Sequence, residues 1–244
     1  MESVSTRLLA TALLLMGLQA TADTPMPQFS ASYTLENNFV TGGIATLSLS
    51  SDSGQHRLML ETTPTGVFKY IDKGKTREIA ELGSLTPPYR AHKYAYTNFG
   101  DEHRSYESTY DRQSGEATMV RNGFSKNFPI DVDAVDRLSS TLTVMQALRE
   151  NPDVAEFSVS IIDRENSQIN NYISRGRETI KTDMGKLSAI RIDRQRSGSD
   201  RQTIMWFAQL GSDALPAPVK IEQYKRGKLQ VRLKITDFST PASQ

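Results

Sequence analysis

Three carboxylates stand close together in the middle of the chain, where Asp131, Asp133 and Asp136 form the pattern D-x-D-x-x-D. Carboxylate oxygens are ligands that Ca²⁺ prefers, so one interpretation is a site for a hard cation. The pattern departs from a calcium loop because it lacks a Gly at the sixth position and a distal Glu. Helix capping together with one buried salt bridge explains the same residues, and we therefore predict no metal site here.

A serine follows the third aspartate in the segment Asp136-Arg137-Leu138-Ser139. Ser139 as a nucleophile would need a general base within reach, and the sequence identifies none. The alternative is hydrogen bonding in the first turn of a helix. We keep Asp136, Arg137 and Ser139 as candidate site residues without assigning them a reaction.

The histidines offer little support for catalysis or metal binding. His56, His92 and His103 form neither an H-x-x-x-H nor an H-E-x-x-H pair, so the sequence predicts no zinc site. His103 follows Asp101 and Glu102 in a polar loop that could carry acid–base catalysis, although a solvated turn has the same composition. Neither G-x-S-x-G nor G-x-G-x-x-G occurs, and we predict no cofactor.

Four aromatic residues are the candidates for ligand contact. Aromatic faces pack against apolar ligands, so these side chains could line a concavity that binds a sugar or a lipid. They could equally fill the interior of a sheet as ordinary core. The candidate residues are Tyr94, Tyr96, Tyr106 and Trp206.

One helix is expected, over Asp131–Glu150, because apolar residues recur there at spacings of three and four. Asp131 or Asp133 is expected to cap its start, and Asn151-Pro152 to end it. The apolar stripe consists of Val135, Leu138, Leu142, Met145 and Leu148.

The rest of the chain indicates roughly a dozen short strands, which is typical of a barrel or a sandwich. Asn122-Gly123 predicts a tight hairpin, and Gly42-Gly43 predicts a turn or a bulge. The fold that accommodates these strands and one amphipathic helix is mainly β. We expect a strongly curved antiparallel sheet, an open or partly closed barrel, with the long helix packed in or over it.

The C-terminal hairpin has a register that the alternation of apolar residues should determine. A three-residue loop at 225–227 pairs Ile221 with Val231 and Val219 with Leu233. Before this hairpin, Ile204–Phe207 lacks charge and is expected to be covered on both faces.

The segment between these strands, Leu210–Pro218, contains Gly211, Pro216 and Pro218. It is expected to be a loop, because Gly and Pro interrupt regular structure.

The N-terminal residues Met1–Ala22 read as a cleavable signal peptide, with a short apolar run and small residues before Asp23. The run Leu8–Leu18 is shorter than the roughly 20 residues of a spanning helix. We expect cleavage after Ala22, a periplasmic location, no transmembrane segment in the mature chain, and a single curved β-sheet domain over residues 23–244.

The overall composition limits the classes of partner that the protein is expected to bind. The formal net charge is +1 with both signs interspersed, so no nucleic-acid partner is expected. The chain contains no Cys, so its stability must come from packing and not from disulfides. The oligomeric state is not indicated by any pattern in the sequence.

A family resemblance rests on the C-terminal strands and on the helix start. The sequence resembles an exported bacterial family, domain of unknown function three thousand one hundred and eight, which implies a compartment and a fold but no activity. A weaker similarity links the C-terminal hairpins to the periplasmic lipoprotein carrier of Gram-negative bacteria and to its outer-membrane receptor. The matching residues are Trp206, Phe207, Leu215, Pro216, Val219–Glu222, Gly227, Leu229–Leu233, Asp237 and Phe238, together with Asp136–Ser139.

Three hypotheses about function follow. The first is a periplasmic binding or carrier module for an apolar or envelope-derived ligand, such as a lipid, a lipoprotein or a glycan, with an apolar cavity between sheet and helix. The second is a cell-envelope hydrolase that acts on a polysaccharide or a cell-wall polymer. It needs a cleft joining Asp101, Glu102 or His103 to another polar cluster. The third is a structural or interaction partner in an envelope complex.

Overall fold

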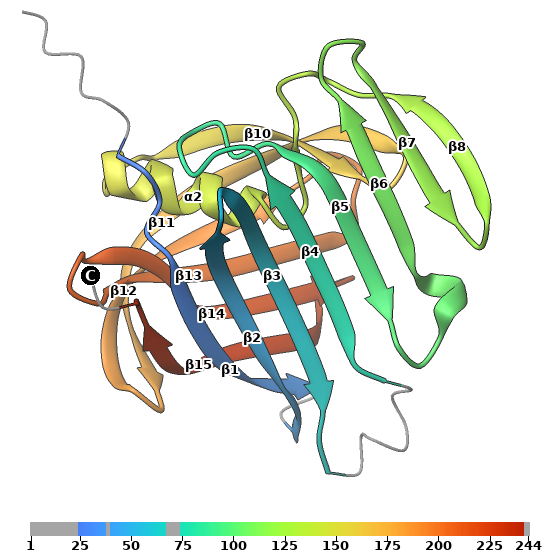
Figure 1. Ribbon diagram of the computed structural model, residues 1–244. Coiled ribbons are helices and arrows are strands. Elements are labelled where there is room, and N and C mark those ends of the chain that lie inside the picture. The colour runs from blue at the N-terminus through green and yellow to red at the C-terminus, as the bar shows by residue number, and fades with distance from the viewer. Residues whose placement is uncertain (1–23, 38–39, 67–73, 242–244) are drawn as a thin grey trace, which may run out of the picture.

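The computed structural model describes residues 24–37, 40–66 and 74–241, and in them the chain forms one sheet of 15 strands with one α-helix (Figure 1). The first strands are β1 (Phe29–Asn37), β2 (Val40–Asp52), β3 (Gln55–Pro64), β4 (Thr76–Leu82), β5 (Ala91–Asn98), β6 (Tyr106–Asp111), β7 (Glu116–Arg121) and β8 (Phe124–Pro129). The later strands are β9 (Val135–Asp136), β10 (Glu156–Asp163), β11 (Asn166–Thr182), β12 (Gly185–Gln195), β13 (Arg201–Leu210), β14 (Leu215–Lys225) and β15 (Lys228–Ser239). The short 3-10 helix η1 spans Glu102–Arg104, and the α-helix α2 spans Ser140–Glu150.

The strand order shows two meanders joined in the middle of the sheet. The order runs from β8 back to β1, then from β15 back to β9, so β1 and β15, the first and last strands in the chain, pair with each other. Every pairing is antiparallel except that of β9 with β10, which is parallel and two residues long. The predicted fold class, a mainly β protein with a curved antiparallel sheet and one helix, is confirmed.

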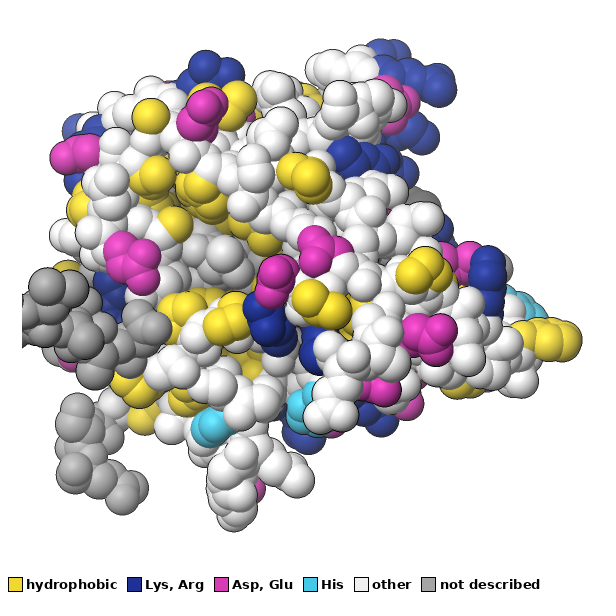
Figure 2. Space-filling view, turned by 90° about the horizontal axis from the view of Figure 1, so that it is seen from above, with side chains coloured by type: hydrophobic (Ala, Val, Ile, Leu, Met, Phe, Trp, Pro, Cys, Tyr) yellow, Lys and Arg dark blue, Asp and Glu magenta, His cyan; other side chains and the backbone are white. Residues whose placement is uncertain are grey.

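The two ends of the sheet approach each other without pairing. The edge strands are β8 and β9, so the barrel is not closed by hydrogen bonds between strands. Side chains and turns bridge the gap: Lys126 of β8 forms an ion pair with Glu165, and the backbone N–H of Asp131 donates to Ser167 Oγ at 3.1 Å. Seen from above, hydrophobic side chains gather around a recess in the surface (Figure 2).

The helix α2 covers β14 with its apolar stripe. Leu142 and Met145 are 0% exposed and Leu148 is 1% exposed, so the contact between helix and sheet is filled by packed side chains. Neither of the two depressions described below is lined by residues of the helix. At these three residues the helix packs directly on the sheet, and the continuous apolar cavity expected between them stays a prediction.

The predicted bounds of the helix, Asp131–Glu150, are wrong at the start. The helix begins at Ser140, and Val135–Asp136 forms strand β9 against Ile161 and Ile162 of β10. The apolar residues that extended the helical pattern upstream are buried by this pairing and by the turn that follows it. A sequence pattern could not reveal the partner strand, because that strand lies after the helix in the chain.

The predicted register of the last hairpin is wrong by two residues. Ile221 pairs with Leu233, and the turn has two residues, Arg226 and Gly227, with φ values of 50° and 70°. Two consecutive positive φ values are characteristic of the tight hairpin turns that match strand twist. A bulge between Gln223 and Tyr224 restores the apolar alignment that a two-residue turn alone would have destroyed.

The predicted loop Leu210–Pro218 is also wrong, because β14 starts at Leu215 and contains both prolines. Pro216 pairs with Gln209 and Pro218 pairs with Phe207 of β13. On its other side β14 begins to pair with β15 only at Lys220, so its first residues form an edge. Pro is tolerated at an edge because no ladder hydrogen bond from its nitrogen is required there.

Other local predictions are confirmed. Asn122-Gly123 makes the turn between β7 and β8, with Arg121 paired to Phe124. The register of β1 against β2 shifts opposite Gly42, which is the predicted bulge. All four residues of Ile204–Phe207 are buried.

The predicted signal peptide, Met1–Ala22, and its cleavage site lie outside the described residues. In the parts of the chain that the structure describes, the longest apolar helical stretch falls short of what crossing a bilayer requires.

Candidate functional site

An arginine, a glutamate and a tyrosine meet on the concave face of the sheet. Arg137 Nη2 lies 2.6 Å from Glu78 Oε1, and the Tyr94 hydroxyl donates to Glu78 Oε2 at 2.7 Å. Arg137 Nη2 also donates to the Tyr94 hydroxyl oxygen at 3.3 Å. We call this group, with the rings of Tyr96 and Tyr106, the Arg137 cluster.

Strand register places the cluster. Glu78 of β4 pairs with Tyr96 of β5, which pairs with Tyr106 of β6, and Tyr94 lies two residues before Tyr96 on the same face. The ring centroids are 5.8 Å apart for Tyr96 and Tyr106 and 5.9 Å apart for Tyr94 and Tyr106. Arg137 arrives from the turn between β9 and α2. The cluster therefore joins the first meander to the segment that leads into the helix.

The charges of the cluster are balanced but not sealed from water. The side chain of Glu78 is 14% exposed, whereas that of Arg137 is 40% exposed. The Glu78 carboxylate holds the pKa of Arg137 above its usual value. Burial, and then the charge of Glu78, raise the pKa of the Tyr94 hydroxyl well above its usual value. Arg137 is thus a permanent cation whose side chain remains partly exposed.

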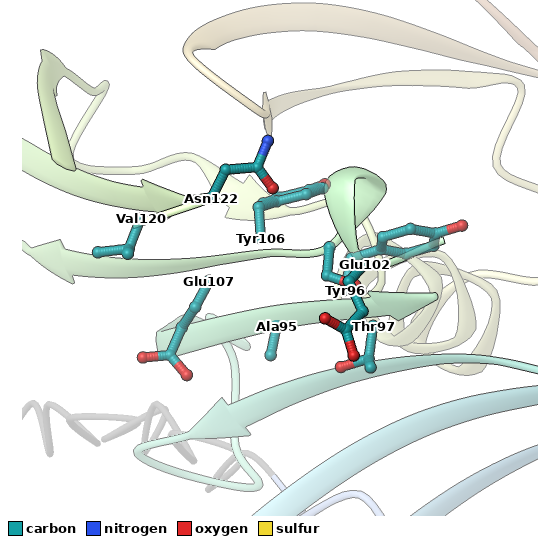
Figure 3. A pocket seen from close by; sticks show the side chains of 9 residues that line it. Ala95, Tyr96, Thr97, Glu102, Tyr106, Glu107, Val120 and Asn122 are labelled. Carbon is teal, nitrogen blue, oxygen red and sulfur yellow. The ribbon is translucent and has the colours of Figure 1, made fainter. Parts of the chain in front are cut away.

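A depression of about 350 Å³ lies beside the cluster (Figure 3). Figure 3 shows the rings of Tyr96 and Tyr106 on one side of strands β5 and β6, while Ala95, Thr97 and Glu107 point to the other. The depression is open and its lining is mostly polar. It is lined by Ala95, Tyr96, Thr97, Glu102, Ser105, Tyr106, Glu107, Val120 and Asn122.

The polar loop at 100–104 reaches this depression through one side chain only. Glu102 of η1 lines it, whereas neither Asp101 nor His103 does. His103 is exposed, and its backbone carbonyl accepts hydrogen bonds from Arg121 Nε and Asn122 Nδ2, at 3.0 and 3.5 Å. The loop is therefore anchored through its backbone, as in a structural turn.

Trp206 lies apart from the three tyrosines. It belongs to β13, where its Nε1 donates to Glu178 Oε2 at 3.0 Å and Lys220 Nζ lies 4.1 Å from the ring centroid. Arg191 lies over the same ring at 5.8 Å. The structure thus brings together Tyr94, Tyr96 and Tyr106 with Arg137, and surrounds Trp206 with charged side chains elsewhere in the sheet.

Asp136 and Ser139 are fully buried, each 0% exposed. Asp136 Oδ1 accepts the backbone N–H groups of Leu138 and Ser139 at 2.9 and 3.0 Å, which is the first-turn hydrogen bonding considered as the alternative. Burial raises the pKa of Asp136, and these donors oppose the rise. Among the described residues Asp136 Oδ2 and Ser139 Oγ have no hydrogen-bond partner. A hydroxyl without access to solvent cannot meet a substrate from solution.

The other two aspartates of D-x-D-x-x-D have separate roles. Asp131 Oδ1 accepts the backbone N–H of Asp133 at 3.0 Å, and Asp133 forms an ion pair with Arg90. No group of three or more His, Cys, Asp or Glu side chains in the described residues is arranged to hold a metal ion.

Sequence reasoning missed Glu78, which makes two of the three polar contacts in the cluster. A signal was present: Glu78 shares the alternation of Ala80 and Leu82, which are both buried. A carboxylate on the buried face of a strand requires a cation or a donor nearby.

Comparisons with known proteins agree with this fold. No curated protein matches the sequence. A solved structure of a beta-barrel-like protein of the domain of unknown function DUF1849 from Brucella abortus has a TM-score of 0.57 and 6% identity, covering 90% of this chain and 99% of that one. Such a low identity shows a common fold alone.

A second solved structure, of a candidate lipoprotein from Parabacteroides distasonis, has 11% identity and covers 88% of this chain and 96% of that one. Its TM-score is 0.29, so no argument is drawn from it. The sequence pattern of one family, described as "Protein of unknown function (DUF3108)", matches residues 28–234. That match spans most of the chain, which therefore belongs to the DUF3108 family.

Proposed function

We propose that this chain is a binding protein for a glycan-bearing ligand of the cell envelope, and that the Arg137 cluster with its adjoining depression is the site. The observation that supports it is the stacked pair of half-buried rings, Tyr96 and Tyr106, on the face of β5 and β6 that carries the Arg137 cluster; both residues also border the open depression. Sugar rings offer apolar C–H faces that pack on aromatic rings, and hydroxyl groups that bond to polar side chains.

The charges near the site support a neutral, hydroxylated ligand. Arg137 is already paired with Glu78, and the depression itself carries Glu102 and Glu107. An anionic ligand would meet these carboxylates. A wholly apolar ligand would need a dry cavity. The depression is instead open with a mostly polar lining, and the residues of α2 that face β14 are packed.

The ring contribution can be tested with soluble oligosaccharides from cell-wall and outer-membrane polymers, by isothermal titration calorimetry. Tyr106→Ala is expected to weaken binding roughly 10-fold or more, because burial of one large aromatic side chain contributes at least about 1.4 kcal/mol. Tyr106→Phe should retain most of the affinity, since it keeps the ring. Phe124→Ala, which truncates an aromatic residue that is 80% exposed at the β7–β8 turn, is the matched control. Equal loss in the control, or no binding by the unaltered protein, would refute the proposal.

The ion pair can be tested separately. Arg137→Gln removes the cation that pairs with Glu78, whose side chain is only 14% exposed. The variant is therefore expected to unfold at a lower urea concentration. The double variant Glu78→Gln/Arg137→Gln removes both charges and should recover most of that stability. Both variants should bind the oligosaccharide more weakly, because Arg137 donors are missing in each. Full affinity in the double variant would assign the pair a structural role only.

The proposal places the protein outside the cytoplasm, with a mature chain that begins at Asp23 and folds as a single domain. Its support is the predicted signal peptide over Met1–Ala22. Intact-mass measurement of the protein recovered from the periplasmic fraction checks the mature N-terminus. A full-length mass in the cytoplasmic fraction would contradict it.

A further inference from the structure

Two turns meet at one end of the sheet, away from the Arg137 cluster. They are the β12–β13 turn and the β14–β15 turn, and Arg226 links them: its backbone N–H donates to Asp200 O at 2.8 Å and its Nε to Asp200 Oδ2 at 3.0 Å. We call residues 195–202 and 224–228 the basic rim. An open depression of about 280 Å³ lies between the two turns.

The basic rim concentrates positive charge. Its charged residues are five basic ones, Arg196, Arg201, Lys225, Arg226 and Lys228, and one acidic one, Asp200. The rim thus has a formal charge of +4, whereas the whole chain carries +1, so the remainder of the chain is net negative by three. The small net charge of the whole chain therefore conceals a strongly basic region on its surface.

Three of these basic side chains stand in one row across neighbouring strands. Arg201 of β13 pairs directly with Lys225 of β14, and Lys225 pairs directly with Lys228 of β15. All three are exposed, and no ion pair involves them within the described residues. Neighbouring strands lie about 4.8 Å apart, and like charges directly opposite each other destabilise a sheet. The fold therefore holds a repulsive row that its own side chains do not neutralise.

We propose that the basic rim docks on a planar surface of anionic phospholipid headgroups. The row lies where β13 begins, β14 ends and β15 begins, so its three exposed cations stand together on one face of the sheet. The depression beside them is open and is lined by Arg196 and Arg201, and its one carboxylate, Asp200, is paired with Arg226. An open basic site suits a headgroup phosphate better than an enclosed soluble ligand. This inference is independent of the glycan site.

The test measures co-sedimentation of the protein with vesicles. Vesicles of phosphatidylcholine alone should not bind it, and vesicles that also contain phosphatidylglycerol should bind it at low salt and release it at high salt. The triple variant Arg201→Gln/Lys225→Gln/Lys228→Gln is expected to bind roughly 100-fold more weakly, since each basic residue near an anionic bilayer contributes about five-fold. Its thermal unfolding midpoint should rise, because the repulsion in the row is gone.

A matched control separates this rim from general charge. Arg177→Gln/Lys181→Gln/Lys186→Gln removes three exposed basic residues of the β11–β12 hairpin, of which Lys181 and Lys186 are also a direct cross-strand pair. The control should keep its affinity for the vesicles. Equal loss in both triple variants, or no preference for phosphatidylglycerol, would overturn the proposal. Binding to a soluble polyanion such as heparin but not to vesicles would also overturn it.

The orientation gives a second readout. Because the chain has no Cys, single cysteines can carry an environment-sensitive fluorophore without background labelling. A probe at Ser199→Cys, in the rim, should shift to the blue on anionic vesicles, whereas a probe at Ser114→Cys, in the β6–β7 turn, should not. A shift at Ser114 alone would assign docking to another face.

Discussion

Leu142→Ala is expected to lower the free energy of unfolding by about 2–5 kcal/mol, the range for a large apolar side chain truncated in a packed core. Leu142 is 0% exposed and lies on the face of α2 that packs against the sheet. The space around it is filled by neighbouring side chains, so the substitution leaves a void that can relax only in part. Urea unfolding followed by circular dichroism measures the change.

Thr141→Ala, on the same helix turn, is the control. Its side chain is partly exposed, and the substitution should change the free energy of unfolding by less than about 0.5 kcal/mol. If Leu142→Ala were as mild as Thr141→Ala, the helix would not be packed as described. The attachment of α2 to the sheet would then have to be abandoned.

Asp136→Ala is expected to cost about 1–3 kcal/mol, because two buried backbone N–H groups lose their acceptor. Asp136→Asn keeps an acceptor oxygen and places an amide beside Ser139, whose hydroxyl has no partner among the described residues. The asparagine variant should therefore be at least as stable as the unaltered protein near neutral pH.

The pH dependence distinguishes these two effects. Burial raises the pKa of Asp136 in the folded state, whereas the pKa in the unfolded state is near 3.9. At a pH between these two pKa values, Asp136 is protonated in the folded state and ionised in the unfolded state. The Asp136 carboxyl therefore contributes favourably to stability below this pH range, and the contribution declines as pH rises through it. The difference in unfolding free energy between Asp136→Asn and the unaltered protein should therefore grow with rising pH. A difference that is constant from about pH 4 to about pH 8 would contradict the raised pKa.

Local patterns predicted a good part of the fold. The alternation in β15, the Asn122-Gly123 turn and the apolar stripe of α2 each depend on neighbours in the sequence, and each is present. Two of the errors arise where a distant strand determines the local structure. Val135–Asp136 became a strand because β10 was available, and Pro216 and Pro218 fit a strand because β15 leaves that edge unpaired.

The candidate site was likewise predictable only in part from the sequence. Tyr94, Tyr96 and Tyr106 could be chosen from their spacing, and Arg137 from its segment. Their meeting depends on the register of β4, β5 and β6 and on the approach of the two sheet ends. Trp206 was an equally good candidate from the sequence, but the strands around it place it among charged side chains.

By itself the sequence determined the Asn122-Gly123 turn and the amphipathic character of the helix, because these depend on residues a few positions apart. Only the tertiary structure decided that Glu78 meets Arg137 and that Arg201, Lys225 and Lys228 stand in one row. Such contacts arise from strand pairing and sheet curvature between distant segments. A single bulge, such as that at Gln223, changes which side chains face each other without altering the apolar pattern that precedes it.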